Sequence, residues 1–137
     1  MTAKCLIYLR VSTSKQATGD KLGLAAQKRI CLEWAEKNNF SPEDILIFQD
    51  EGVSGATPVH KRPGLSGLLD QLRAGDVLLV QKLDRLSRDL MTNLYIEELL
   101  KKKRAGLLSV SGEGTTGTDA TSILLKRILQ SFSEFER

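Results

Sequence analysis

Val77-Leu78-Leu79-Val80 is the stretch that decides the fold, because it is apolar at every position. A short apolar run of this kind indicates a strand buried on both faces, which is typical of a parallel sheet. It follows one helical pattern and precedes another. The run therefore predicts a central strand in a domain of mixed strands and helices.

The rest of the chain repeats this alternation. Strand patterns cover 4–9, 45–48, 77–80 and 107–110, and helical patterns cover 24–38, 63–75 and 90–104 and begin again at 122. Such an order favours an α/β domain in which helices cover both faces of a sheet. The last pattern stops at Arg137 with no terminating residue, which predicts a helix that is cut or is completed by a partner subunit. An ordinary core helix that frays at its end is the alternative.

Length and composition exclude several classes of protein. The chain has 137 residues, 41% apolar and 27% charged, which is ordinary for one globular domain. No apolar run is long enough for a membrane span, and we expect no signal peptide, because a strand pattern begins at once. Two cysteines and one histidine suit neither a disulfide framework nor a metal site. We expect a cytoplasmic protein with buried free thiols and without metal or cofactor.

The charge is distributed unevenly. The net charge is +3, but residues 1–29 carry +5, residues 30–60 carry −5 and residues 61–104 carry +4. Two basic segments that come together on folding would form one positive face suited to nucleic acid. Solvated lysines are the ordinary alternative.

Candidate functional residues cluster where strands end, as active sites do in open parallel sheets. The first strand is followed by Arg10-Val11-Ser12, and the third by Gln81-Lys82-Leu83-Asp84-Arg85-Leu86-Ser87-Arg88. A serine among several arginines suits phosphoryl transfer, because guanidinium groups match phosphate oxygens with paired hydrogen bonds. The structural alternative is that Ser12 caps a turn and that Asp84 and Arg88 form an exposed i,i+4 pair.

Taken together, these segments resemble the resolvase/invertase family of serine site-specific recombinases. The resemblance covers nearly the whole chain, in order and at consistent spacing. It rests on four blocks, Tyr8-Leu9-Arg10-Val11-Ser12-Thr13-x-x-Gln16, Asp50-Glu51-Gly52-Val53-Ser54-Gly55, Arg62-Pro63-Gly64-Leu65 and Lys82-Leu83-Asp84-Arg85-Leu86-Ser87-Arg88.

The resemblance implies a role for each matching residue. Ser12 would be the nucleophile that attacks a scissile DNA phosphate and forms a 5′-phosphoserine link without ATP or metal. Arg10, Arg85 and Arg88 would hold the phosphate, with Arg62 assisting. Asp84 would serve either proton transfer or the placement of arginine. The supporting or DNA-binding residues would be Gln16, Gln27, Asp50, Ser54 and Lys82.

The resemblance also implies a fold and partners. The fold would be a three-layer α/β/α sandwich, and the last helix would begin a long helix that dimerises and contacts DNA. The partners would be double-stranded DNA and further subunits, first as a dimer and then as a synaptic tetramer, in a bacterial or phage mobile element.

Two departures from the family pattern affect these expectations. The loop at 17–23 is longer than in compact resolvases, which leaves the role of Gln27 open. In addition, the family places its DNA-binding domain after the point where this sequence stops, so we expect the chain to be a catalytic domain cut within its last helix, without that DNA-binding domain.

One competing motif is present. Gly112-Glu113-Gly114-Thr115-Thr116-Gly117 matches the dinucleotide-binding pattern G-x-G-x-x-G after a strand. The alternative function is therefore a non-catalytic nucleotide-binding or regulatory module. A glycine-rich loop is the favoured interpretation, because Glu113 would face a pyrophosphate.

Overall fold

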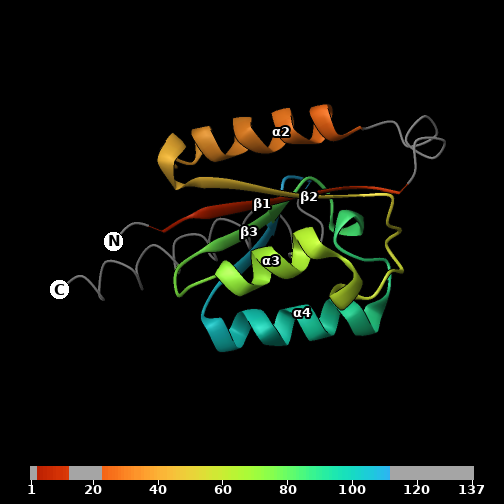
Figure 1. Ribbon diagram of the computed structural model, residues 1–137. Coiled ribbons are helices and arrows are strands. Elements are labelled where there is room, and N and C mark those ends of the chain that lie inside the picture. Colours follow the sequence, from red (N-terminus) through yellow and green to blue (C-terminus); the bar gives the residue numbers. More distant parts are fainter. Residues whose placement is uncertain (1–2, 13–22, 112–137) are drawn as a thin grey trace.

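The computed structural model of the chain describes residues 3–12 and 23–111 (Figure 1). Gln16, the loop expected at 17–22, the glycine-rich motif at 112–117 and the helix expected from 122 lie outside these residues.

Within the described residues, four parallel strands form one sheet in the order β2-β1-β3-β4. They are β1 (Cys5–Val11), β2 (Ile45–Glu51), β3 (Val77–Val80) and β4 (Gly106–Ser109). The predicted α/β class is confirmed. β1 and β2 extend beyond their predicted ends because Arg10 pairs with Asp50 and Val11 with Glu51. Backbone pairing continues there although the side chains are no longer all apolar.

Helices lie on both faces of this sheet. α2 (Leu24–Lys37) covers one face, and α3 (Pro63–Gln71) and α4 (Leu90–Lys103) cover the other (Figure 1). Short 3₁₀ turns occupy the connections as η1 (Pro42–Asp44), η2 (Val59–Lys61) and η3 (Leu83–Arg85). The three-layer arrangement expected from the resemblance is thus confirmed for the described part of the chain.

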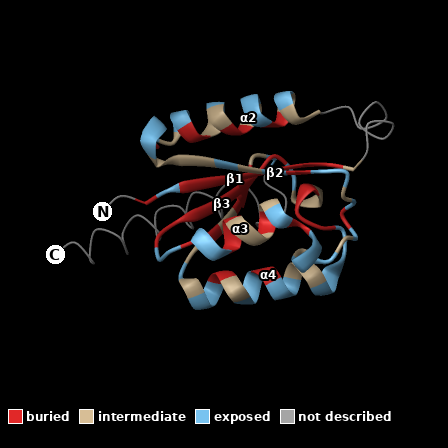
Figure 2. Ribbon diagram, in the orientation of Figure 1, coloured by how far each residue is buried: buried red, intermediate tan, exposed pale blue. Residues whose placement is uncertain are grey.

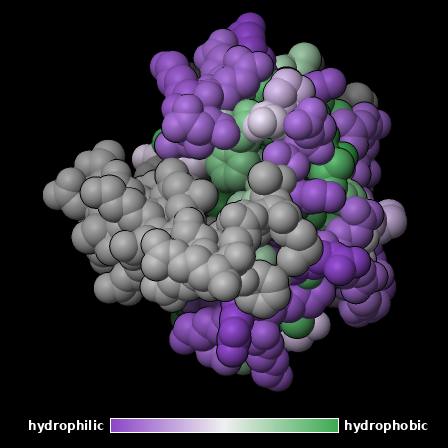
Figure 3. All heavy atoms as spheres, turned by 90° about the vertical axis from the view of Figure 1, so that its left-hand side faces the viewer, coloured by the Kyte–Doolittle hydropathy of each residue, from purple (hydrophilic) through white to green (hydrophobic). Residues whose placement is uncertain are grey.

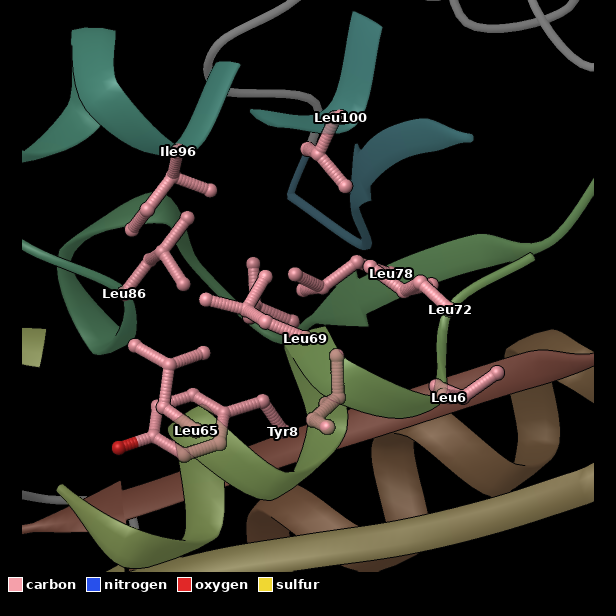
Figure 4. Packing of buried hydrophobic residues seen from close by; sticks show 11 residues of the cluster. Leu6, Tyr8, Leu65, Leu69, Leu72, Leu78, Leu86, Ile96 and Leu100 are labelled. Atoms are coloured by element: carbon pink, nitrogen blue, oxygen red, sulfur yellow. The ribbon is translucent and has the colours of Figure 1, made fainter. Parts of the chain in front are cut away.

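Strand alternation divides the interior into two cores. β1 and β3 are buried along their whole length, as Figure 2 shows. Odd-numbered residues such as Ile7 and Leu79 pack beneath α2, where Cys5 and Cys31 are buried as free thiols, as expected. Even-numbered residues such as Leu6 and Leu78 pack against α3 and α4 (Figure 4). The sheet is therefore held from both sides.

The distribution of hydrophilic and apolar side chains on the surface follows these three layers. Viewed from the side of the molecule where the N-terminus lies, hydrophilic side chains cover much of the upper and lower layers, and apolar side chains show between them (Figure 3). Among the described residues, no helix is both long and apolar enough to cross a membrane.

The strand order creates a switch point between β1 and β3. The chain passes from β1 to β2 on one side of the sheet and then returns to β3 on the other side. Connections after β1 and β3 leave on opposite faces, and ligands of open parallel sheets generally bind outside the carboxyl ends of such a pair of strands. The predicted site residues lie at this end.

Candidate active site

Ser12 is the first residue after β1 and is half-buried. Its neighbourhood includes the loop after β2, because the Gly52 N–H donates a 3.0 Å hydrogen bond to the Val11 carbonyl. Gly52 has a φ of +72°, and a Cβ there would lie 3.6 Å from the Ser12 carbonyl oxygen. That distance is ordinary van der Waals contact, so glycine is favoured here by the left-handed turn and not by crowding against Ser12.

Arg10 is buried near the end of β1 and joins two loops. Its Nε donates to the Arg85 carbonyl at 2.9 Å, its Nη2 to the Asp84 carbonyl at 2.9 Å and its Nη1 to the Val53 carbonyl at 3.0 Å. Burial, together with the positive charges of Arg62 and Arg85, lowers the pKa of Arg10. The guanidinium is thus at the site, where it binds backbone carbonyls of both loops.

Arg62 makes a similar set of contacts from the far side of the loop after β2. It is fully buried, with 0% of its surface exposed. Its Nε donates to the Thr57 carbonyl at 2.9 Å, its Nη2 to the Gly55 carbonyl at 2.8 Å and its Nη1 to the Leu86 carbonyl. Arg62 therefore fixes the 53–57 loop against the segment after η3, and its expected contact with a phosphate stays a prediction.

Gln27 completes the end of β1. β3 pairs with β1 only through Cys5–Ile7, so the backbone beyond that point needs another partner on this side. The Gln27 side chain provides it, since Oε1 accepts from the Arg10 N–H at 3.3 Å and Nε2 donates to the Arg10 carbonyl at 3.0 Å. Despite the longer preceding loop, Gln27 lies directly against a predicted site residue.

Asp50 ties β1 and β2 to the start of α3. Its Oδ2 accepts from the Tyr8 hydroxyl at 2.8 Å and the Leu65 N–H at 3.0 Å, and its Oδ1 accepts from the Gly64 N–H at 2.7 Å. A carboxylate at this place satisfies free N–H groups of the first helical turn. Burial and the hydrogen bond to Asp50 raise the pKa of Tyr8 above its usual value.

Arg85 is buried in η3 and Asp84 beside it is half-buried, whereas the other predicted residues face solvent. Arg88 has 78% of its side chain exposed, and its Nη2 lies 4.0 Å from Asp84 Oδ2, so the expected i,i+4 pair is present. Ser54 bonds locally to Thr57, and Lys82 is exposed just before η3. Within the described part of the chain, the Ser12 hydroxyl has no hydrogen bond to Arg10, Arg85 or Arg88. The structure brings Arg10, Arg62 and the η3 backbone together and leaves the Arg88 guanidinium exposed to solvent.

Two residues near this cluster were not predicted as members of the site. Tyr8 sits in an otherwise apolar stretch of strand, and a buried tyrosine hydroxyl requires a partner, which is a signal that sequence inspection offers. Ser87 is buried and donates to the Gly55 carbonyl at 3.0 Å, for which the sequence gives no signal.

Positive charge is in excess where the site is most enclosed. Among the described residues, the buried charged side chains at this end of the sheet are those of Arg10, Arg62, Arg85 and Asp50. The other buried carboxylate, Asp76, precedes β3 at the opposite end of the sheet. Asp84 Oδ1 is also buried, and its charge acts on Arg10. The three guanidinium groups outnumber these two carboxylates, which leaves a positive field that favours an anion at this end of the sheet.

The fold and the site together define an α/β domain that carries a serine and a cluster of guanidinium groups at the switch point of a parallel sheet. The chain belongs to the resolvase family, because the family model for the resolvase N-terminal domain matches residues 5–137. The family resemblance inferred from the four sequence blocks is thereby confirmed.

Individual relatives are consistent with this assignment. The chain is 31% identical over 137 residues to the transposon Tn2501 resolvase of Escherichia coli, covering 98% of the chain and 64% of that protein. It is 32% identical over 133 residues to a putative DNA recombinase of Bacillus subtilis, covering 96% of the chain and 25% of that protein. The chain thus spans less than two thirds of either relative.

A solved structure matches almost completely. The N-terminal catalytic domain of TP901-1 integrase has a TM-score of 0.71 and 31% identity to this chain. The alignment covers 98% of this chain and 96% of that domain. The described fold is therefore that of a serine recombinase catalytic domain.

Proposed function

We propose that the chain is the catalytic domain of a site-specific DNA recombinase in which Ser12 cleaves and rejoins DNA. The observation that carries the proposal is the excess of buried guanidinium groups at the end of β1, beside Ser12. Arg10 and Arg62 bind backbone carbonyls, which carry no net charge, and a DNA phosphate would place a negative charge beside their guanidinium groups. No other part of the described chain combines a hydroxyl nucleophile with such a field.

The reaction is a phosphoryl transfer that conserves the energy of the bond. The Ser12 Oγ attacks phosphorus as its proton departs, and the bond from phosphorus to the deoxyribose O3′ breaks. The products are a 5′-phosphoserine ester and a 3′-hydroxyl, whose oxygen has taken up a proton. Attack of a 3′-hydroxyl on the ester reverses these steps, so strands rejoin without ATP.

The four arginines have different roles in this reaction. Arg10 and Arg85 supply positive charge from buried positions at the end of the sheet. Arg10 donates three of its five N–H groups to carbonyls and has two left for phosphate oxygens. Arg88 approaches the phosphate from solvent and pairs with its oxygens. Asp84, 4.0 Å from Arg88, orients that guanidinium or moves a proton. Arg62 is buried and acts by fixing the 53–57 loop against the segment after η3.

The supporting residues hold this arrangement in place. Gln27 fixes the Arg10 backbone and Asp50 fixes the start of α3, as their hydrogen bonds indicate. Lys82 and Ser54 are exposed and are assigned to contacts with the DNA backbone. Gln16 is assigned to the same role from the family pattern.

Self-association forms part of the proposal. Leu90, Met91, Leu94 and Tyr95 are exposed large apolar side chains of α4. Residues four apart are neighbours on a helix, so the pairs Leu90–Leu94 and Met91–Tyr95 form one apolar surface. An exposed surface of this kind supports contact between subunits, as expected for a dimer and a synaptic tetramer.

The test is detection of DNA attached to Ser12. The full chain is fused to a DNA-binding module of known specificity and incubated with DNA carrying paired target sites. The reaction is then quenched in denaturant and analysed by mass spectrometry. We expect a covalent adduct in the wild type and none in Ser12→Ala. Absence of the wild-type adduct, with dimer formation and DNA occupancy verified, would refute the proposal.

A further inference from the structure

Ser87 occupies the contact between the two loops of the site. It is 2% exposed, and its hydroxyl donates to the Gly55 carbonyl at 3.0 Å. The same oxygen accepts from the Asp89 N–H at 2.9 Å. One hydroxyl therefore closes the turn at 87–89 and fastens that turn to the loop after β2.

Arg88 is the middle residue of this turn. A Cβ on Gly55 would lie 3.5 Å from the Arg88 backbone nitrogen, so the Arg88 backbone already rests against the 53–57 loop. From α4, Asn93 Nδ2 donates to the Ser87 carbonyl at 3.2 Å. The backbone of Arg88 is thus held on both sides through its neighbour Ser87.

The Arg88 side chain is differently placed. Its guanidinium has one ionic contact in the described part of the chain, the 4.0 Å pair with Asp84, and is otherwise exposed. Arg10, Arg62 and Arg85 are buried. The direction from which Arg88 reaches an anion therefore depends mainly on where its backbone lies.

We propose that Ser87 is a positioning residue for DNA cleavage, which acts by fixing the backbone from which Arg88 reaches the phosphate. The proposal deepens the proposed function and rests on it. A misplacement of about 1 Å is sufficient to slow an enzyme by up to about a hundredfold, so loss of one hydroxyl at this point has a measurable effect.

The experiment measures the rate at which the Ser12 adduct forms in the fused full chain at saturating DNA. Ser87→Ala removes both hydrogen bonds and is expected to lower this rate about tenfold, with DNA occupancy unchanged. Ser87→Thr keeps the hydroxyl and is expected to restore most of the rate. Thr92→Ala is the matched control, since it removes a hydroxyl hydrogen bond to Asp89 in the same first turn of α4. Its rate should stay within about twofold of the wild type.

A double-mutant cycle separates positioning from a general structural role. If Ser87 acts through Arg88, Ser87→Ala should have almost no effect on the rate in an Arg88→Ala background, measured over long incubations. Equal losses in both backgrounds, or a wild-type rate in Ser87→Ala, would overturn the inference. A wild type that forms no adduct would instead refute the proposed function, and this inference with it.

Discussion

The side-chain amide of Gln27 hydrogen-bonds both backbone groups of Arg10, at 3.3 Å to the N–H and 3.0 Å to the carbonyl. Gln27 thereby satisfies the backbone hydrogen bonds at the end of β1 that a neighbouring strand satisfies elsewhere in the sheet. Both groups are buried, so they depend on this one side chain.

Gln27→Met is expected to destabilise the protein, because methionine has a similar length and cannot pair with either group. At about 1–3 kcal/mol for each of the two unsatisfied buried groups, the free energy of unfolding should fall by about 2–6 kcal/mol. Urea denaturation followed by the fluorescence of the single tryptophan, Trp34, measures this. Lys28→Met, at an exposed position of the same helix, should change it by less than about 0.5 kcal/mol. Equal stabilities of the two variants would contradict the role assigned to Gln27.

Two glycines of α3 should respond oppositely to alanine. A Cβ on Gly64 would lie 2.3 Å from the Gln49 carbonyl oxygen, whereas a Cβ on Gly67 would meet nothing within 4 Å. Gly64→Ala must displace α3 from β2 and should cost more than about 2 kcal/mol. Gly67→Ala should stabilise the helix by up to about 1 kcal/mol. The melting temperatures of both variants, from thermal unfolding, measure these changes. A Gly64→Ala protein as stable as the wild type would show that α3 does not pack against β2 as described.

The fold could be predicted from the sequence because hydrophobic periodicity reflects burial directly. The run at 77–80 is buried on both faces, as its composition indicated. The region of the site was predictable too, because carboxyl ends of parallel strands meet at one edge. Both predictions, of the fold and of the region of the site, depend on which side chains are apolar and which are polar, and the sequence gives this directly.

The partners of the arginines could not be predicted, and the reason is physical. Arg10 and Arg62 bind the backbone carbonyls of Val53, Gly55 and Leu86, among others. Every residue has a carbonyl, so such a partner leaves no trace in the sequence. The same holds for Ser87, whose acceptor is also a carbonyl of Gly55.

Alkaline pH should destabilise the protein through its two thiols. Burial raises the pKa of Cys5 and of Cys31 to about 12 in the folded state. The unfolded thiols lose their protons from about pH 8.5, so above that pH the unfolded state binds fewer protons and stability falls until the folded thiols also ionise.

Between about pH 9.5 and 11, the two thiols together should contribute a slope of about −2.7 kcal/mol per pH unit. Urea titrations across this range measure it. The double variant Cys5→Ala/Cys31→Ala should lack this part of the slope, while other groups titrate in both proteins. Identical slopes for the variant and the wild type would mean that the thiols are not buried in the folded state.

The apolar surface of α4 should govern self-association. Leu94→Glu places a charge among Leu90, Met91 and Tyr95, where a partner subunit would have to bury it. The dissociation constant of the dimer should rise by at least about tenfold, as measured by sedimentation equilibrium. Ile47→Glu, at an exposed apolar position of β2, is the control and should leave it unchanged. If both variants associate like the wild type, α4 is not the contact surface.

Replacing arginine by lysine should separate the buried Arg62 from the exposed Arg88. Lysine is a compact charge and cannot reach the three carbonyls that Arg62 binds, so Arg62→Lys should cost about 2 kcal/mol or more of unfolding free energy. Arg88→Lys should leave stability within about 0.5 kcal/mol but slow adduct formation at Ser12 about tenfold, because paired hydrogen bonds to phosphate are lost. Urea denaturation and the cleavage assay measure both effects. The reverse pattern, a stable Arg62→Lys and an unstable Arg88→Lys, would mean that the two arginines have been assigned to the wrong roles.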